Sequence, residues 1–160
     1  CRKPLVIMAP KSLLRHKECV SSVEDFAEGS FQEIIDDPEA NKNASRLIFC
    51  SGKIYYELLD FRRQNGIKNT AIIRLEQFYP FHAERFKEIL ARYPKGKKLV
   101  WCQEEPKNMG GWSFVTPYFI EHANNAPRYA GRQAAASPAP GSLALHKVEQ
   151  KELIEQAFSV

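Results

Sequence analysis

Short apolar runs alternate along this chain with longer stretches in which apolar residues recur at helical spacing. Residues 5–9, 46–50, 70–75 and 98–103 are nearly continuous apolar runs, which are typical of strands buried on both faces of a sheet. A shorter run at 128–131 predicts a further strand. Helical spacing predicts helices over 54–62, 86–93, 112–122 and 142–158, and one helical turn over 11–16. The acidic stretch before residue 43 is predicted as a surface loop, because Pro38 interrupts it.

Strands that alternate with amphipathic helices across short connections predict an α/β fold. We expect one domain over residues 1–160, built as a three-layer αβα sandwich around a mostly parallel sheet of about five strands. In such sheets, ligands bind where the loops converge at the carboxyl ends of the strands. Here those ends carry Ser51–Gly52–Lys53, Glu76–Gln77 and the segment from Glu104 to Lys107.

Length and composition restrict the class of protein. A chain of 160 residues suits one domain and can bury about 70% of its unfolded surface. Hydrophobic residues make up 44% and charged residues 26%, values that exclude a disordered or fibrous protein. No run approaches the length of a membrane helix and no signal peptide opens the chain, so we expect no membrane contact and a cytoplasmic location. The four cysteines show no CxxC spacing, which favours a reducing compartment. Because the chain begins with Cys1, a cleaved mature form and a piece of a longer polypeptide both stay open.

Charge is distributed unevenly although the net charge is only +4, which is too weak to indicate a nucleic-acid partner. Residues 1–17 carry five cations and no acid, whereas residues 18–41 carry eight acids and no Lys or Arg. One interpretation is a pair of surface clusters that partly neutralise each other. The other is a basic first segment that binds an anionic ligand.

Two motifs at the strand ends carry candidate chemistry. Ser51–Gly52–Lys53 resembles the tail of a phosphate loop, but the upstream glycine and the following Ser or Thr are absent, so an ordinary strand-to-helix turn is favoured. Glu104 and Glu105 form a carboxylate pair. Successive strand side chains point to opposite faces, so the pair would not share a proton. Lys107 is placed to neutralise one of them, and an orienting or interface role is favoured over catalysis.

The thiols and imidazoles do not complete a catalytic set. Cys50 and Cys102 end predicted buried strands, where cysteine behaves as a small apolar residue. The four histidines show no metal-ligand spacing, so we expect no metal site. Glycines before Trp112 and the small-residue loop after Arg132 are open to interpretation as tight turns or as contact surfaces. These features favour a support, interface or regulatory domain over an autonomous enzyme.

Several motifs, in order from about Lys3 to the end, closely resemble one known family. The chain is similar to the C-terminal domain of the decarboxylating component of 2-oxoglutarate dehydrogenase. The segments that carry the resemblance are residues 10–16, 51–56, 74–80, 103–108 with 111–112, and 128–138.

The resemblance implies a transketolase C-terminal-like fold at the end of a much longer enzyme. That enzyme would use thiamine diphosphate and magnesium to decarboxylate 2-oxoglutarate and would pass the succinyl group to a dihydrolipoyl succinyltransferase. The cofactors and the proton-transfer histidines would lie in upstream domains, so this domain would hold no cofactor and would be inactive alone. It would pack on the catalytic domains and extend the homodimer, in a bacterial cytoplasm or a mitochondrial matrix.

The resemblance also implies candidate site residues. Some members bind acetyl-CoA as a regulator, which requires cations for its phosphates. The anion candidates are Ser12, Arg15, Lys17, Lys53 and Arg74. The interface candidates are Glu104, Glu105, Lys107, Asn108, Trp112, Arg128 and Arg132.

Three alternatives stay open from the sequence. The chain could be a free-standing module that binds an anionic nucleotide or acyl-CoA. It could be the corresponding domain of a 2-oxoadipate-type dehydrogenase, since substrate choice would be made in other domains. A cysteine-dependent enzyme is the weakest alternative.

Overall fold

The computed structural model describes residues 2–4 and 6–159. These residues form two compact units, and the boundary in the sequence lies between Phe31 and Gln32. The first unit contains a 3-10 helix, Lys11–Arg15, and the short helix α1, Val23–Glu28. Neither helix buries a side chain. A capping box starts α1, because the Ser22 hydroxyl accepts from the Asp25 amide (3.2 Å) and the Asp25 carboxylate accepts from the Ser22 amide (3.0 Å).

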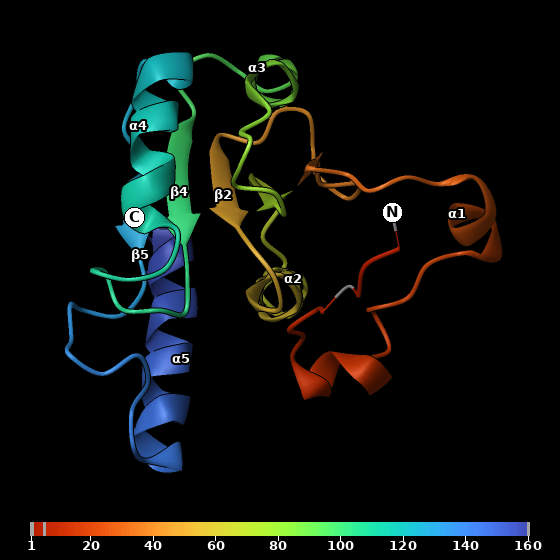
Figure 1. Ribbon diagram of the computed structural model, residues 1–160. Coiled ribbons are helices and arrows are strands. Elements are labelled where there is room, and N and C mark those ends of the chain that lie inside the picture. Colours follow the sequence, from red (N-terminus) through yellow and green to blue (C-terminus); the bar gives the residue numbers. More distant parts are fainter. Residues whose placement is uncertain (1, 5, 160) are drawn as a thin grey trace. The chain divides into compact units, whose positions relative to one another are not determined.

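The second unit is built on a five-stranded sheet with the strand order β1-β3-β2-β4-β5 (Figure 1). β1 runs antiparallel to β3, and the other neighbours are parallel. The strands are β1 (Ile34–Ile35), β2 (Arg46–Cys50), β3 (Thr70–Leu75), β4 (Lys98–Cys102) and β5 (Arg128–Ala130). The helices are α2 (Ile54–Gln64), α3 (Ala83–Ala91), α4 (Trp112–Ala123) and α5 (Leu143–Ser159).

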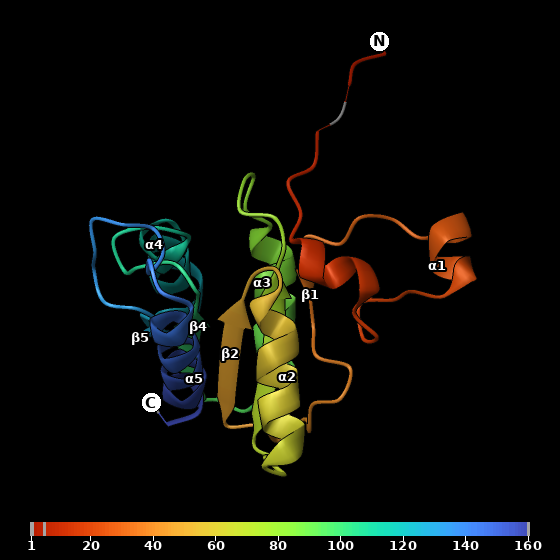
Figure 2. The same cartoon turned by 90° about the horizontal axis from the view of Figure 1, so that it is seen from below.

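Helices cover both faces of this sheet, which gives the three-layer αβα fold predicted from the sequence. On one face, Phe86 of α3 and Phe119 of α4 pack on Phe49 of β2. On the other face lie α2 and α5 (Figure 2), which pack on the alternate strand residues. Leu58 and Leu153 lie in that core. The central strands are therefore buried on both sides, which explains why their sequences are continuously apolar.

Local chemistry sets the ends of the helices. The His82 side chain accepts from the Arg85 amide at 3.1 Å and caps the start of α3. After α2, Gly66 adopts a φ of +61°, a left-handed conformation that lets the chain turn back toward β3. No helix among residues 2–4 and 6–159 is long and apolar enough to span a bilayer.

Two sequence predictions about the first 43 residues are wrong. Residues 6–9 are not a buried strand, since Val6, Ile7 and Met8 are exposed and have no regular structure; Leu5 lies outside the described residues. The fifth strand is instead β1 at the sheet edge. The acidic stretch is also not simply a surface loop, because it contains α1, β1 and the buried Asp37. An apolar run predicts that its side chains will be buried, but it does not identify the surface that buries them.

Candidate functional site

The carboxyl ends of β2 and β4 are joined by a polar cluster. The Lys53 ammonium group forms an ion pair with Glu104 and lies 3.5 Å from the Glu57 carboxylate. Gln150 of α5 donates its amide to Glu104 (2.9 Å) and to Glu57 (3.1 Å). Lys53 is therefore the cation that neutralises Glu104. The prediction that Lys107 neutralises one of the two carboxylates stays a prediction for Glu105. The pairing forms because parallel strands place their ends at the same edge of the sheet.

Arg132, which follows β5, is held by side chains of α5. Its guanidinium Nε lies 3.0 Å from the Glu149 carboxylate, and Nη2 donates to His146 Nδ1 at 2.8 Å. Because arginine has only donors, His146 Nδ1 acts as the acceptor in this contact. A cavity of about 380 Å³ lies beside the pair and is lined by Arg132, Glu149, small residues of 133–140 and the α5 residue Leu153.

Gln103 organises the turn between β4 and α4. This side chain is 3% exposed. Its oxygen accepts from Trp101 Nε1 (2.8 Å) and from the Trp112 amide (2.9 Å). Its amide nitrogen donates to the carbonyl groups of residues 105, 106 and 109. A side chain at Gly131 would lie 2.8 Å from the Gln103 carbonyl oxygen, so only glycine fits there. One buried amide thus fixes the whole turn.

The loops after β4 and β5 are held together by polar side chains. The Tyr129 hydroxyl bonds the Arg132 carbonyl at 2.7 Å, and burial raises the pKa of Tyr129 to about 12. The Lys107 ammonium lies 5.5 Å from the centre of the Tyr129 ring. The Asn108 amide exchanges two hydrogen bonds with the Ala135 backbone, at 3.0 and 3.1 Å. These contacts attach the small-residue loop to the domain.

The other strand-end cation is also engaged by an acid. Arg74 forms an ion pair with Glu76 at 2.9 Å, and its guanidinium lies 4.8 Å from the centre of the Tyr55 ring. Cys50 and Cys102 are fully buried, as predicted, and burial raises the pKa of each thiol. Buried neutral thiols are poor nucleophiles. Among residues 2–4 and 6–159, no three His, Cys, Asp or Glu side chains gather as metal ligands.

A family model described as "2-oxoglutarate dehydrogenase C-terminal" matches residues 20–158. The 2-oxoglutarate dehydrogenase E1 component of Cupriavidus necator is 49% identical over 163 residues, covering 99% of this chain and 17% of the relative. The proteins of the same name from Azotobacter vinelandii and Haemophilus influenzae are 44% and 45% identical, again over 99% of this chain. The chain belongs to the 2-oxoglutarate dehydrogenase E1 family. It spans less than a fifth of the length of the curated relatives and corresponds to their C-terminal part.

Within this C-terminal domain, the predicted interface residues separate into two groups. Most lie in the turns that Gln103 and Tyr129 organise, and Arg128 does not, since it starts β5 at the other end of the strand. The residues brought together are Glu104, Glu105, Lys107, Asn108, Trp112 and Arg132. Glu105 contributes its carbonyl group rather than its carboxylate.

The predicted anion-binding residues are divided between the two units. Lys53 and Arg74 lie at strand ends of the second unit, and each is paired with an acid. Ser12, Arg15 and Lys17 are exposed in the first unit. No carboxylate among the described residues forms an ion pair with Arg15 or Lys17.

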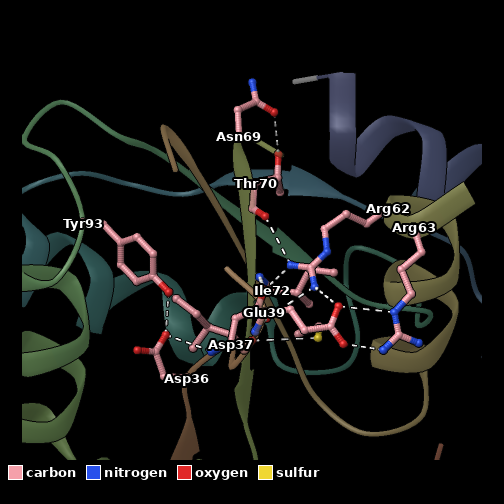
Figure 3. Close-up of polar contacts among 11 residues, drawn as sticks. Asp36, Asp37, Glu39, Arg62, Arg63, Asn69, Thr70, Ile72 and Tyr93 are labelled. Atoms are coloured by element: carbon pink, nitrogen blue, oxygen red, sulfur yellow. Dashed lines mark hydrogen bonds and ion pairs between the residues drawn. The ribbon is translucent and has the colours of Figure 1, made fainter. Parts of the chain in front are cut away.

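Sequence reasoning missed a buried ion pair between the start of the unit and α2 (Figure 3). The Asp37 carboxylate binds the Arg62 guanidinium and accepts from the Ile72 amide at 2.8 Å. Arg62 also donates to the Thr70 carbonyl at 3.3 Å and to Glu39 at 3.2 Å. The signal available in the sequence was an arginine on the apolar face of a predicted helix, which requires a buried acid elsewhere.

Proposed function

We propose that residues 1–160 are the non-catalytic C-terminal domain of an E1 enzyme that decarboxylates 2-oxoglutarate and transfers the succinyl group to the lipoyl group of a dihydrolipoyl succinyltransferase. In that role the domain packs on the upstream catalytic domains and supports their homodimer. The observation that carries the proposal is the mutual pairing of the polar side chains at the carboxyl ends of the strands. Lys53 is committed to Glu104, and Arg132 to Glu149 and His146.

The chemistry of these residues does not fit thiamine diphosphate and magnesium, the cofactors that the family resemblance implies. Magnesium requires several oxygen ligands in near-octahedral geometry, and a diphosphate requires free cations or converging backbone donors. Glu104, Glu76 and Glu149 are paired with the cations Lys53, Arg74 and Arg132. We therefore assign both cofactors to the upstream part of the parent enzyme and derive no step through them here.

The test compares the 160-residue chain with the full-length parent enzyme. With 2-oxoglutarate, thiamine diphosphate and magnesium, we expect CO₂ release from the parent and none from the chain alone. In the parent, Lys53→Met should change kcat by less than about threefold, because the Lys53 ammonium group is already paired with Glu104 and Glu57 of this domain. Decarboxylation by the isolated chain, or loss of kcat by more than tenfold in a folded Lys53→Met parent, would contradict the proposal. The ratio of kcat/KM for 2-oxoglutarate and 2-oxoadipate identifies the substrate.

A second candidate function is the binding of an anionic acyl-CoA regulator by the first unit. It is supported by the exposed guanidinium and ammonium groups of Arg15 and Lys17, neither of which forms an ion pair with a carboxylate of the described residues. The paired state of Lys53 and Arg74 favours residues 11–17 over those two side chains. The ligand would be held by its phosphates through charge-assisted hydrogen bonds.

Calorimetric titration of the parent enzyme with acetyl-CoA tests this assignment. We expect Arg15→Gln to weaken acetyl-CoA binding at least tenfold, and the control Arg85→Gln, in an exposed pair on α3, to leave binding unchanged. Equal binding by both variants would contradict it. Micromolar binding by the isolated chain would instead support a free-standing acyl-CoA module.

A further inference from the structure

The first unit exposes most of its large apolar side chains. Of the fourteen exposed large hydrophobic residues among those the structure describes, eight lie between residues 6 and 31. Met8 is 92% exposed and Phe26 is 81% exposed. The eight are Val6, Ile7, Met8, Leu14, Val20, Val23, Phe26 and Phe31. A concentration of this kind marks a surface that another surface covers.

The helix α1 has an apolar stripe opposite an acidic face. Val23, Phe26 and Ala27 fall within an arc of about 100° at 100° per residue. Glu24, Asp25 and Glu28 occupy the other side. An isolated helix shorter than about 12 residues is only marginally stable in water, and a capping box adds about 1 kcal/mol. This six-residue helix therefore needs tertiary packing on its apolar stripe.

The matches to relatives indicate which surface provides that packing. The C-terminal family model begins at residue 20, so residues 6–19 precede it. The curated relatives match 99% of this chain but have more than four fifths of their length outside the matched region. Residues 6–19 thus precede the matched C-terminal region, and residues 20–31, with α1, form its first part, so the segment adjoins the rest of a longer E1 polypeptide.

We propose that residues 6–31 form a docking segment that packs the apolar stripe of α1 against the part of the parent E1 polypeptide preceding the C-terminal domain. This inference rests on the proposed function, since it requires a longer parent chain. The partner surface is apolar where it meets Val23 and Phe26, with basic residues at its border opposite Glu24 and Glu28.

Hydrogen exchange measured by mass spectrometry tests the docking segment. Amides of residues 20–31 are compared in the full-length parent enzyme and in the 160-residue chain. We expect exchange at least tenfold slower in the parent, because packing protects helical amides from opening. Equal exchange in both proteins would overturn the proposal, whether both are fast or both are slow. Protection in the isolated chain that grows with protein concentration would also overturn it, because a second copy would then be the partner.

Matched variants of the parent make the test specific. Phe26→Ser should accelerate exchange of residues 20–31 to the rate in the isolated chain. The control Val148→Ser removes an exposed apolar residue of α5 and should leave that exchange unchanged. If Phe26→Ser leaves the exchange slow, the stripe is not the contact. Decarboxylation of 2-oxoglutarate is assayed on the same parent. If residues 20–31 are protected but the parent is inactive, the proposed activity fails and the docking segment does not.

Discussion

Residues 6–31 and residues 32–159 both contain many large apolar side chains, but only the second region buries them. In the second region, two cores enclose the sheet, with Phe119 and Leu58 fully buried on opposite faces. In the first region, Val23 and Phe26 are about four fifths exposed. The difference shows that a chain can complete one folding unit and still carry a segment whose burial depends on another surface.

Truncating phenylalanine should affect the two regions very differently. Phe119 has no exposed surface and makes edge contacts with Phe49 and Phe86, each at 4.9 Å between ring centres. We expect Phe119→Ala to lower the free energy of unfolding by about 3–5 kcal/mol, because it leaves a cavity. Phe26→Ala should change it by less than about 0.5 kcal/mol in the isolated chain. Urea denaturation of both variants measures this, and equal losses would remove the distinction between the regions.

Removal of one partner of the buried Asp37–Arg62 ion pair should lower the free energy of unfolding much more than replacement of both partners by apolar residues. Asp37→Ala leaves the buried Arg62 guanidinium with only the partly exposed Glu39 carboxylate, and we expect a loss of about 3–5 kcal/mol of unfolding free energy. The double variant Asp37→Leu with Arg62→Met should recover most of that loss. Glu84→Ala, which breaks an exposed pair with Lys87, should cost less than about 1 kcal/mol. A double variant as unstable as Asp37→Ala would show that the charges themselves are needed.

The Gln103 amide should be the main polar support of the turn after β4. Gln103→Met keeps the volume but leaves Trp101 Nε1 and the Trp112 amide without an acceptor, and we expect a loss of about 2–4 kcal/mol. Gln133→Met, at an exposed position, serves as the control and should be close to neutral. Chemical denaturation measures the loss, and the Trp101 indole NMR signal reports the broken bond. Unchanged stability and an unchanged indole signal would contradict this account of the turn.

Stability should fall at high pH through the raised pKa of Tyr129. The folded pKa is about 12 and the ordinary value is 10, so the stabilisation is complete below pH 10. It is lost as pH rises toward 12, because the unfolded state ionises first. Tyr129→Phe should flatten this dependence in denaturation curves measured between pH 9 and 12. If the unfolding free energy of Tyr129→Phe depends on pH as steeply as that of the unaltered chain, other groups cause the loss of stability.

The sequence predicted most of the second region because each of its elements carries a local signal. The apolar runs of β2, β3 and β4 and the periodic helix α3 appear where they were expected. The errors concern partners distant in sequence. Residues 6–9 have the composition of a buried strand, but no strand among the described residues pairs with them. The ion pair of Asp37 with Arg62 spans 25 residues, and no local pattern connects the two.

The sequence predicted which residues lie at the ends of the strands, but it did not predict most of the hydrogen bonds and ion pairs that they form. Register places the ends of β2 and β4 together, so the meeting of residue 53 with residue 104 follows from the parallel topology. The roles of Gln150 and His146 could not be predicted, because they depend on how α5 crosses the ends of the strands. Gln103 was visible within a motif, but its multiple hydrogen bonds depend on a tertiary turn.

The free energy of unfolding of residues 32–160 alone shows whether residues 2–31 lie outside the folding unit of the sheet. We expect a cooperative urea transition within about 1 kcal/mol of that of the complete chain, because the helices of residues 2–31 bury no side chain and both cores lie in residues 32–159. Loss of the cooperative transition, or a decrease of more than about 2 kcal/mol, would contradict it, because residues 2–31 would then belong to the same folding unit.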